Sequence, residues 1–244
     1  MRILDGQLVA FMGDSITEHL MAVSDWMETQ TDGLPPVGTQ VRVDRHENRG
    51  WSVMLANRIH LAYPERRIRY INAGIGGHSS RQILARFDID IITHNPQWLL
   101  LSAGVVEVRR TYQPDRVSER VPLNEYVANL TMTVSKALDM GMRVILLEPT
   151  PHTRPVTGSP PEVTLQEVNT LTRQYATAMT QVAHETQVGF VPLFETFLHI
   201  EHRLSGEASL YADEVHLSAR GDLLYSQLVY QYLESRHLLP AEEN

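Results

Sequence analysis

A serine near the start of the chain and an aspartate–histidine pair near its end are the residues that best combine into a reactive site. Ser15 follows Gly13 closely at the end of an apolar run, and Asp213 stands three residues before His216. These side chains supply what acyl transfer requires, because an imidazole takes the serine proton and a carboxylate orients the imidazole ring. Each motif also has an ordinary interpretation, since a serine suits a helix N-cap and an Asp-x-x-His suits a solvated loop.

To act as a nucleophile, Ser15 needs a strand before it and a sharp turn around it. The apolar run Leu8–Met12 is short enough for a buried strand, and Gly13 allows the chain to turn. Asp14 and Thr17 are residue types that begin helices. A hydroxyl on such a strand-to-helix turn lies at the carboxyl end of a sheet, beside backbone N–H groups and a positive helix end.

The rest of the chain alternates between short apolar runs and longer amphipathic stretches. We expect strands at Leu8–Met12, Arg69–Asn72, Trp98–Leu101, Val144–Leu147 and Gly189–Val191. We expect helices at 50–62, 79–95, 122–140, 162–186, 194–204 and 218–236, and irregular segments at 17–48, 104–121 and 149–161. Strands separated by helices imply a parallel sheet covered on both faces. The sequence therefore predicts one α/β domain over residues 1–244, a three-layer α/β/α sandwich with a five-stranded parallel sheet.

Composition and charge exclude several classes of function. The chain has 244 residues, of which 43% are hydrophobic and 20% charged, and its net charge is -8. This negative charge argues against general binding to nucleic acid or to anionic membranes, which both favour basic surfaces. With no cysteine, disulfides, thiolate catalysis and cysteine metal sites are excluded. No apolar run approaches 18 residues, so we expect a soluble cytoplasmic protein. The sequence leaves open whether it forms a homo-oligomer.

Three motifs occur in an order that resembles a known family. Gly13-Asp14-Ser15, the segment Asn72–Gly77 and the segment Asp213–His216 resemble the ordered sequence blocks of the SGNH hydrolases, the GDSL-type esterase and lipase superfamily. The resemblance covers nearly the whole chain and implies a flavodoxin-like SGNH hydrolase fold. The intervening helices and the segment after the third strand look most similar to bacterial acetyl esterases that act on xylan and other acetylated sugars.

The resemblance implies a role for each matching residue. It implies that Ser15 is the nucleophile, that His216 is the general base and acid, and that Asp213 orients His216. It also implies an oxyanion hole formed by the backbone N–H groups of Ser15 and Gly77. A glycine suits this role, because no side chain hinders the approach of the substrate. No cofactor and no metal are expected; His199 and His202 are interpreted as part of a solvated helix face.

The sequence departs from the family in the third block, which normally reads Gly-x-Asn-Asp. Val106 stands where the family has the asparagine that donates to the oxyanion, and Glu107 stands at the following aspartate. Valine cannot donate a hydrogen bond, and one lost oxyanion donor typically lowers turnover by roughly 10²–10³. Either the enzyme is slow, or another donor such as His78, Asn72 or Arg109 replaces the amide, or the protein only binds an acylated ligand.

The predicted function is hydrolysis of short acyl esters, above all acetyl esters, of a carbohydrate or other small alcohol. The expected partner is therefore a small-molecule ester. A thioesterase, a lysophospholipase and a catalytically impaired binding protein stay open as alternatives. The candidate substrate contacts are Asp14, His78, Glu107 and Arg109, although Asp14 is expected mainly to support its turn. The further arginines Arg110, Arg116 and Arg120 are interpreted chiefly as surface charge that pairs with Asp115 and Glu119.

Overall fold

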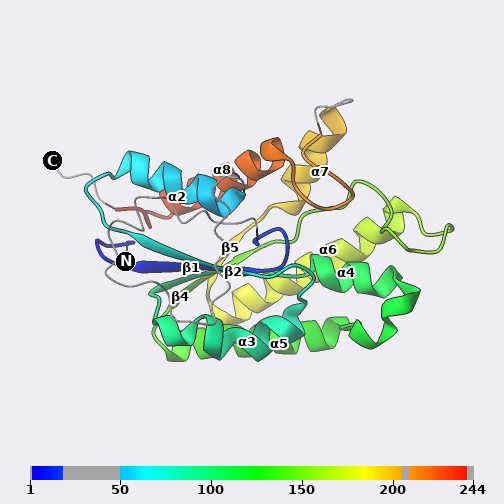
Figure 1. The fold of residues 1–244 in the computed structure, drawn as a ribbon, viewed down its shortest axis with the longest axis horizontal. Helices are drawn as coiled ribbons and strands as arrows, with labels where there is room; N and C mark the ends of the chain where they lie inside the picture. Colours follow the sequence, from blue (N-terminus) through cyan, green and yellow to red (C-terminus); the bar gives the residue numbers. More distant parts are fainter. Residues whose placement is uncertain (1, 19–49, 205–208, 241–244) are drawn as a thin grey trace.

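Five parallel strands form the sheet at the centre of the protein (Figure 1). The computed structural model describes residues 2–18, 50–204 and 209–240. The strands lie in the order β2-β1-β3-β4-β5 and are all parallel. Their bounds are Leu8–Gly13 for β1, Arg69–Gly74 for β2, Trp98–Ser102 for β3, Arg143–Leu147 for β4 and Gly189–Val191 for β5. All five predicted strands are confirmed. The strand β2 lies on one side of β1, and β3, β4 and β5 lie on the other, so the strand order reverses at β1. In folds of this type, ligands bind at the point where the strand order reverses.

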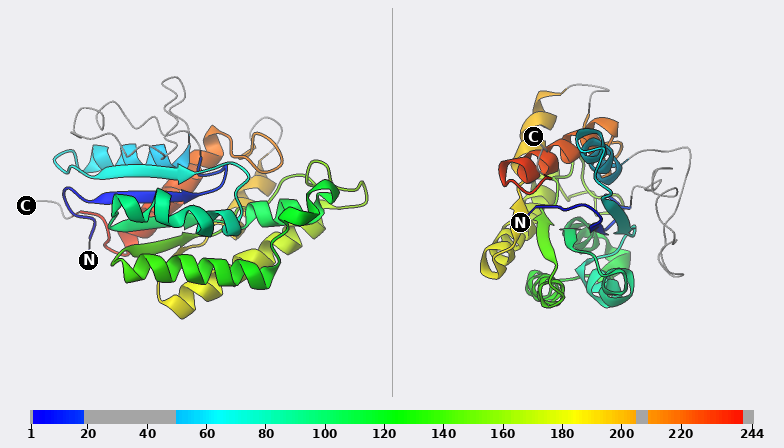
Figure 2. Two further views of the ribbon diagram at one scale, coloured as in Figure 1. Left: turned by 60° about the horizontal axis from the view of Figure 1, so that its bottom comes forward. Right: turned by 90° about the vertical axis from the view of Figure 1, so that its left-hand side faces the viewer.

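Helices cover both faces of this sheet, as predicted (Figures 1 and 2). The helices α2, α7 and α8 lie on one face, and α3, α5 and α6 lie on the other. Their bounds are Trp51–Ala62 for α2, Ser80–Asp90 for α3, Leu123–Asp139 for α5, Leu165–Thr186 for α6, Phe194–Arg203 for α7 and Ala219–Ser235 for α8. A 3₁₀ turn, η1, spans Ile92–His94. No helix among the described residues combines the length and apolarity that crossing a membrane requires.

The two cores on either face of the sheet follow from the alternation of side chains along the strands. In β1, Phe11 points into the core under α2 and α8, where its ring lies 5.3 Å from Trp51 and 5.8 Å from Tyr70, measured between ring centroids. Ala10 and Met12 point into the core on the opposite face. All six residues of β1 are buried, so the turn that carries Ser15 begins from a rigid central strand.

The segment 104–121 is not irregular, and this prediction was wrong. It contains the helix α4, which spans Val105–Tyr112, and a 3₁₀ segment, η2, which spans Pro114–Glu119. The valines and arginines of this segment do not favour a helix by propensity or periodicity. Val105 and Val108 are nevertheless buried, each in the core on a different face of the sheet. The Glu107 carboxylate also accepts a hydrogen bond from the Gly104 N–H at 3.1 Å, which caps the helix start.

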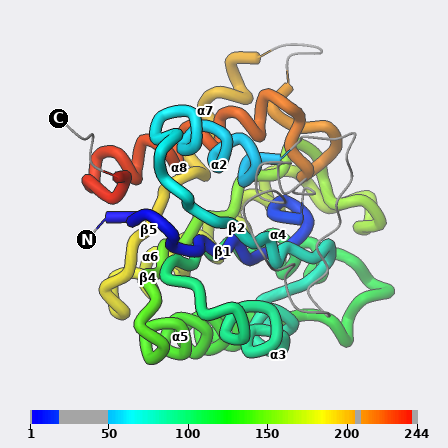
Figure 3. The backbone as a smooth tube through the Cα atoms, turned by 60° about the vertical axis from the view of Figure 1, so that its left-hand side comes forward, coloured from blue at the N-terminus to red at the C-terminus, as the bar shows by residue number. Residues whose placement is uncertain are grey.

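The segment 149–161 contains no helix or strand, as its prolines predict. It follows the carboxyl end of β4, and because the strands are parallel, this is the edge of the sheet at which β1 also ends (Figure 3). The irregular segment expected at 17–48 falls almost entirely outside the described residues.

Candidate active site

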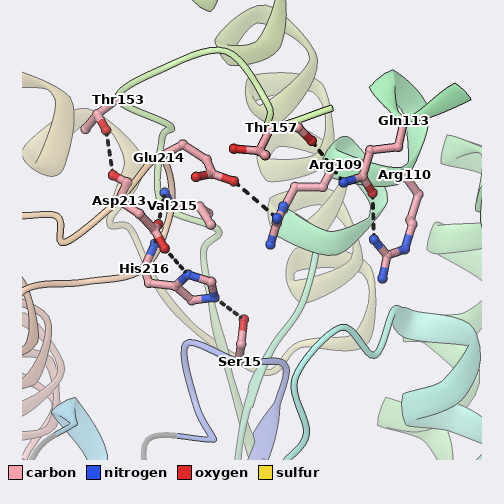
Figure 4. Close-up of polar contacts among 10 residues, drawn as sticks. All are labelled: Ser15, Arg109, Arg110, Gln113, Thr153, Thr157, Asp213, Glu214, Val215 and His216. Atoms are coloured by element: carbon pink, nitrogen blue, oxygen red, sulfur yellow. Dashed lines mark hydrogen bonds and ion pairs between the residues drawn. The ribbon is translucent and has the colours of Figure 1, made fainter. Parts of the chain in front are cut away.

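The structure brings Ser15, His216 and Asp213 together, although 201 residues separate the first two in sequence (Figure 4). The Ser15 Oγ lies 2.9 Å from Nε2 of His216. On the other side of the imidazole, Nδ1 lies 2.6 Å from Oδ2 of Asp213. Hydroxyl, imidazole and carboxylate therefore form a continuous hydrogen-bonded chain, the arrangement that allows a histidine to remove the proton of a serine.

A short closed loop before α8 sets the orientation of the aspartate and the histidine. The loop is closed by an antiparallel bridge between Tyr211 and Leu217. Inside it, Oδ1 of Asp213 accepts hydrogen bonds from the N–H groups of Val215 and His216, each at 2.8 Å. Partial burial alone would raise the pKa of Asp213, but these hydrogen bonds and the one to the imidazole outweigh it and hold the pKa below its ordinary value. The carboxylate thus stays ionised while its second oxygen binds the imidazole.

The turn after β1 is held by Asp14, not by Ser15. The Asp14 carbonyl accepts hydrogen bonds from the N–H groups of Thr17 and Glu18, and its Oδ1 accepts one from Ile16 at 2.9 Å. The Asp14 side chain is 1% exposed, and this burial raises its pKa to about 6. Asp14 therefore shapes the turn, as expected, and presents no accessible surface for the predicted contact with substrate.

The turn between β2 and α3 lies directly against Ser15. A Cβ atom added to Gly76 would lie 3.6 Å from the Cβ of Ser15, so the two turns are in contact. Gly77 has a φ of +75°, a conformation that favours glycine. Within the described part of the chain, neither the Ser15 N–H nor the Gly77 N–H has a hydrogen-bond acceptor. Both amides of the predicted oxyanion hole are thus available to an external oxygen atom.

Asn72, one of the three residues considered as replacement oxyanion donors, is engaged elsewhere. Asn72 donates to the Thr17 carbonyl at 2.6 Å and to Ser52 Oγ at 3.2 Å, and its Oδ1 accepts from the Gly74 N–H. Asn72 therefore ties β2 to the turn of the serine. His78 has its pKa lowered by burial and by the charge of Arg86, and its buried Nδ1 has no hydrogen-bond partner among the described residues.

The third block of the family pattern forms the start of α4. Val106 is 4% exposed and offers no polar atom. Glu107 is fully buried, with Oε1 accepting from the Ser80 N–H at 2.6 Å and Oε2 accepting from the Gly104 N–H. Burial raises the pKa of Glu107 against the effect of these hydrogen bonds. Glu107 thus joins the starts of α3 and α4, and it has no exposed atom for the predicted contact with substrate.

The next turn of α4 carries two arginines toward the site (Figure 4). Arg109 donates from Nη2 to Oε1 of Glu214 at 3.1 Å, beside Asp213. Arg110 reaches the turn between β2 and α3, where its Nη2 would lie 3.2 Å from a Cβ added to Gly77. Arg110 was interpreted from the sequence chiefly as surface charge, but its side chain is largely buried. Its spacing of four residues from Val106 was a usable signal, but only once this segment is recognised as a helix.

The segment 149–161 is attached to the site at two points. Thr153 donates from its N–H to the Glu214 carbonyl and from Oγ1 to the Asp213 carbonyl, each at 3.0 Å. At the other end, Gln113 donates to the Thr157 carbonyl at 3.1 Å (Figure 4). These hydrogen bonds fix the segment between the Asp213 loop and the end of α4, as one wall of the site.

No group of side chains able to hold a metal ion occurs among residues 2–18, 50–204 and 209–240. His199 and His202 are exposed on α7.

The chain is similar to known proteins over most of its length. The sequence profile of the GDSL-like lipase/acylhydrolase family matches residues 11–224. An acetylxylan esterase from Geobacillus stearothermophilus is 26% identical over 242 residues, which cover 97% of this chain and 100% of that protein. A crystal structure of an acetylxylan esterase from the same organism is similar with a TM-score of 0.74, at 25% identity over 96% of each chain. Three further structures show catalytic mutants of that esterase, in which a serine, an aspartate or a histidine is replaced by alanine.

A more distant structure shares the fold alone. An α/β hydrolase from the metagenome of Lake Arreo, Spain, has a TM-score of 0.70 at 21% identity, over 98% of this chain and 99% of that one. Because the family profile spans most of the sequence, the chain belongs to the GDSL-like lipase/acylhydrolase family. It is a carboxylic ester hydrolase with the SGNH hydrolase fold, as the resemblance of its sequence blocks implied.

Proposed function

We propose that the protein is a serine esterase that removes short acyl groups, above all acetyl groups, from a carbohydrate or other small alcohol. The observation that carries the proposal is the hydrogen-bonded chain from Ser15 through His216 to Asp213. The acetylxylan esterases to which the chain is similar support acetylated xylo-oligosaccharides as the first substrates to test.

In the first half of the reaction, Ser15 attacks the ester carbonyl carbon. The Ser15 Oγ–carbon bond forms while the hydroxyl proton moves to Nε2 of His216, and the carbonyl electron pair moves onto the oxygen. The N–H groups of Ser15 and Gly77 donate hydrogen bonds to this negative oxygen. When the carbonyl re-forms, the bond to the alcohol oxygen breaks and His216 gives that oxygen its proton, which leaves an acyl-serine.

In the second half, water replaces the alcohol. His216 takes a proton from the water as its oxygen attacks the acyl carbon, and the second tetrahedral intermediate uses the same two amides. Its collapse breaks the bond to Ser15, which recovers its proton from His216, and releases the carboxylic acid. The ionised Asp213 stabilises the imidazolium in both halves without taking up the proton itself.

The proposal is tested by hydrolysis of p-nitrophenyl acetate, butyrate and octanoate, and of an acetylated xylo-oligosaccharide, by the wild type and by Ser15→Ala. We expect the acetate to be the best of the three aryl esters and Ser15→Ala to lose at least about 10³-fold in kcat. The exposed Ser118→Ala in η2 is the matched control and should keep the wild-type rate.

Two outcomes would change the proposal. An unchanged rate in Ser15→Ala would refute the assignment of the nucleophile. A Ser15-dependent preference for an acyl thioester or for lysophosphatidylcholine would move the substrate to the thioesterase or lysophospholipase class.

A further inference from the structure

We infer that Arg110 is a catalytic residue of this esterase, whose Nη2 donates to the oxyanion in place of the missing asparagine amide. The inference rests on the proposed function, because it concerns the negative oxygen that forms when Ser15 attacks an ester. It starts from Val106, which removes a side-chain donor from the site without adding another polar atom.

The geometry of α4 places Arg110 where it can act for residue 106. Residues four apart in a helix lie on the same face, and helical side chains lean toward the N-terminus of the helix. Arg110 therefore extends back over the turn that carries Val106. A long guanidinium side chain attached one turn later can thus reach the place that a short amide would occupy.

Contacts within the structure direct one edge of the guanidinium toward the oxyanion turn. Nη1 donates to Oε1 of Gln113 at 2.6 Å, and Nε lies 2.8 Å from Oε2 of Glu119. Nη2 has no hydrogen-bond acceptor among the described residues, and it is the atom that lies beside Gly77. The side chain is 14% exposed, so its position is held by packing as well as by these two partners.

The neighbouring arginine is a weaker candidate for the same role. Nη2 of Arg109 already donates to Glu214, on the side of the loop that carries Asp213 (Figure 4). Nη2 of Arg110, in contrast, lies beside Gly77, at 3.2 Å from the place that a Cβ would take, and the proposed mechanism already uses the N–H of this residue. A charged N–H donor beside this amide is well suited to an oxygen that becomes negative, because charge-assisted hydrogen bonds strengthen as the charge develops.

The test is a double-mutant cycle between Arg110 and Val106, measured with p-nitrophenyl acetate. We expect Arg110→Gln to lower kcat by about 10²-fold and to change KM by less than about threefold, because a transition-state interaction is lost. Val106→Asn should change the wild-type rate little, but in the Arg110→Gln background it should restore kcat at least about tenfold. Such restoration separates an oxyanion donor from a residue that only holds α4 in place.

The matched control is Arg116→Gln, since Arg116 also pairs with Glu119, at 2.7 Å, but is half exposed in η2. Its kcat should stay within about twofold of the wild type. A second readout is the rate at which p-nitrophenyl ethylphosphonate inactivates Ser15, because the phosphoryl oxygen imitates the oxyanion. Arg110→Gln should slow this inactivation by a factor similar to its loss in kcat.

The outcomes separate this inference from the proposed function. If the wild type shows no turnover that depends on Ser15, both fail. If the wild type hydrolyses the ester and Arg110→Gln keeps kcat within about threefold, or if Arg109→Gln shows the loss in kcat instead, only the role of Arg110 is refuted.

If circular dichroism shows that Arg110→Gln is misfolded, Arg110→Lys replaces it. Lysine keeps the cation but lacks the outer nitrogen, so we expect about a tenfold loss in kcat, and a wild-type kcat would refute the inference.

Discussion

At the scale of single residues, the site combines side chains that stay charged with side chains that burial makes costly to charge. Asp213 keeps its negative charge because three hydrogen bonds favour the ionised form. Asp14 and Glu107 are buried carboxyls of the turns around the site; burial raises the pKa of each, and the charge of Glu107 raises the pKa of Asp14 further. Hydrogen bonds thus favour the ionised form of the carboxylate that orients the imidazole, whereas burial favours the protonated form of the two carboxyls that build the turns.

Asp14 should make the stability of the fold depend on pH. Its pKa in the folded protein is about 6, against an ordinary value of 3.8, so folding takes up a proton between these values. Stability therefore falls as the pH rises from about 4 to about 6, by roughly 3 kcal/mol at about 1.4 kcal/mol per unit of pKa.

Urea unfolding of the wild type and of Asp14→Asn between pH 4 and pH 7 measures this effect. The asparagine oxygen can still accept from Ile16 but does not titrate, so the variant should gain stability relative to the wild type as the pH rises. The exposed Asp115→Asn serves as the control. A constant difference between the wild type and Asp14→Asn over this range would contradict the raised pKa.

At the scale of elements, the site depends on how helix starts are satisfied by carboxylates from other segments. Glu107 accepts from the starts of α3 and α4, and Glu148, just after β4, accepts from the N–H groups of Leu193 and Phe194 at 2.7 Å each. These carboxylates join the loops at the carboxyl ends of the strands to the helices that follow. Each also lies at the positive end of a helix dipole.

Replacing Glu148 should loosen the start of α7. Glu148→Ala leaves the Leu193 and Phe194 N–H groups without their acceptor, and we expect a loss of about 1–3 kcal/mol in the free energy of unfolding. Glu148→Gln keeps an oxygen acceptor and should lose less. Glu167→Ala, which removes an exposed cap at the start of α6, is the control and should lose less than Glu148→Ala. Both losses are measured by urea unfolding. Equal losses would contradict the expectation that the partly buried Glu148 stabilises its helix start more than the exposed Glu167 does.

At the scale of the whole molecule, the strand β1 joins two cores that lie on opposite faces of the sheet. The aromatic group of Phe11, Trp51 and Tyr70 packs the face under α2 and α8. Ser15 stands only four residues after Phe11. Stability of this core and position of the nucleophile are therefore coupled through one short strand.

Phe11→Ala should destabilise the protein by about 3–5 kcal/mol, because it removes a fully buried ring and leaves a cavity between two aromatic neighbours. Leu61→Ala on α2 is the control: its side chain is 82% exposed, and its change should stay within about 0.5 kcal/mol. Both values come from urea unfolding followed by circular dichroism. A loss below about 1 kcal/mol for Phe11→Ala would mean that this core does not stabilise the sheet as described.

The sequence by itself determined the strands, most of the helices and the residues of the triad. Short apolar runs and helical periodicity are local patterns, so the five strands could be located without knowledge of their neighbours. Ser15, Asp213 and His216 were found because their residue types and the order of their motifs point to one chemistry. The sequence also showed that Val106 removes an expected donor.

Only the tertiary structure showed the helix α4 and the position of Arg110 beside Gly77. The segment 104–121 contains α4 because Val105 and Val108 are buried in the two cores and Glu107 caps the helix, and neither effect appears in a local pattern. Asn72 was a reasonable donor by sequence distance, but the fold engages its side chain in hydrogen bonds to Thr17, Ser52 and Gly74. Arg110 lies beside Gly77 because two strands that are neighbours of β1 end at the same edge of the sheet, a proximity that spacing along the chain does not contain.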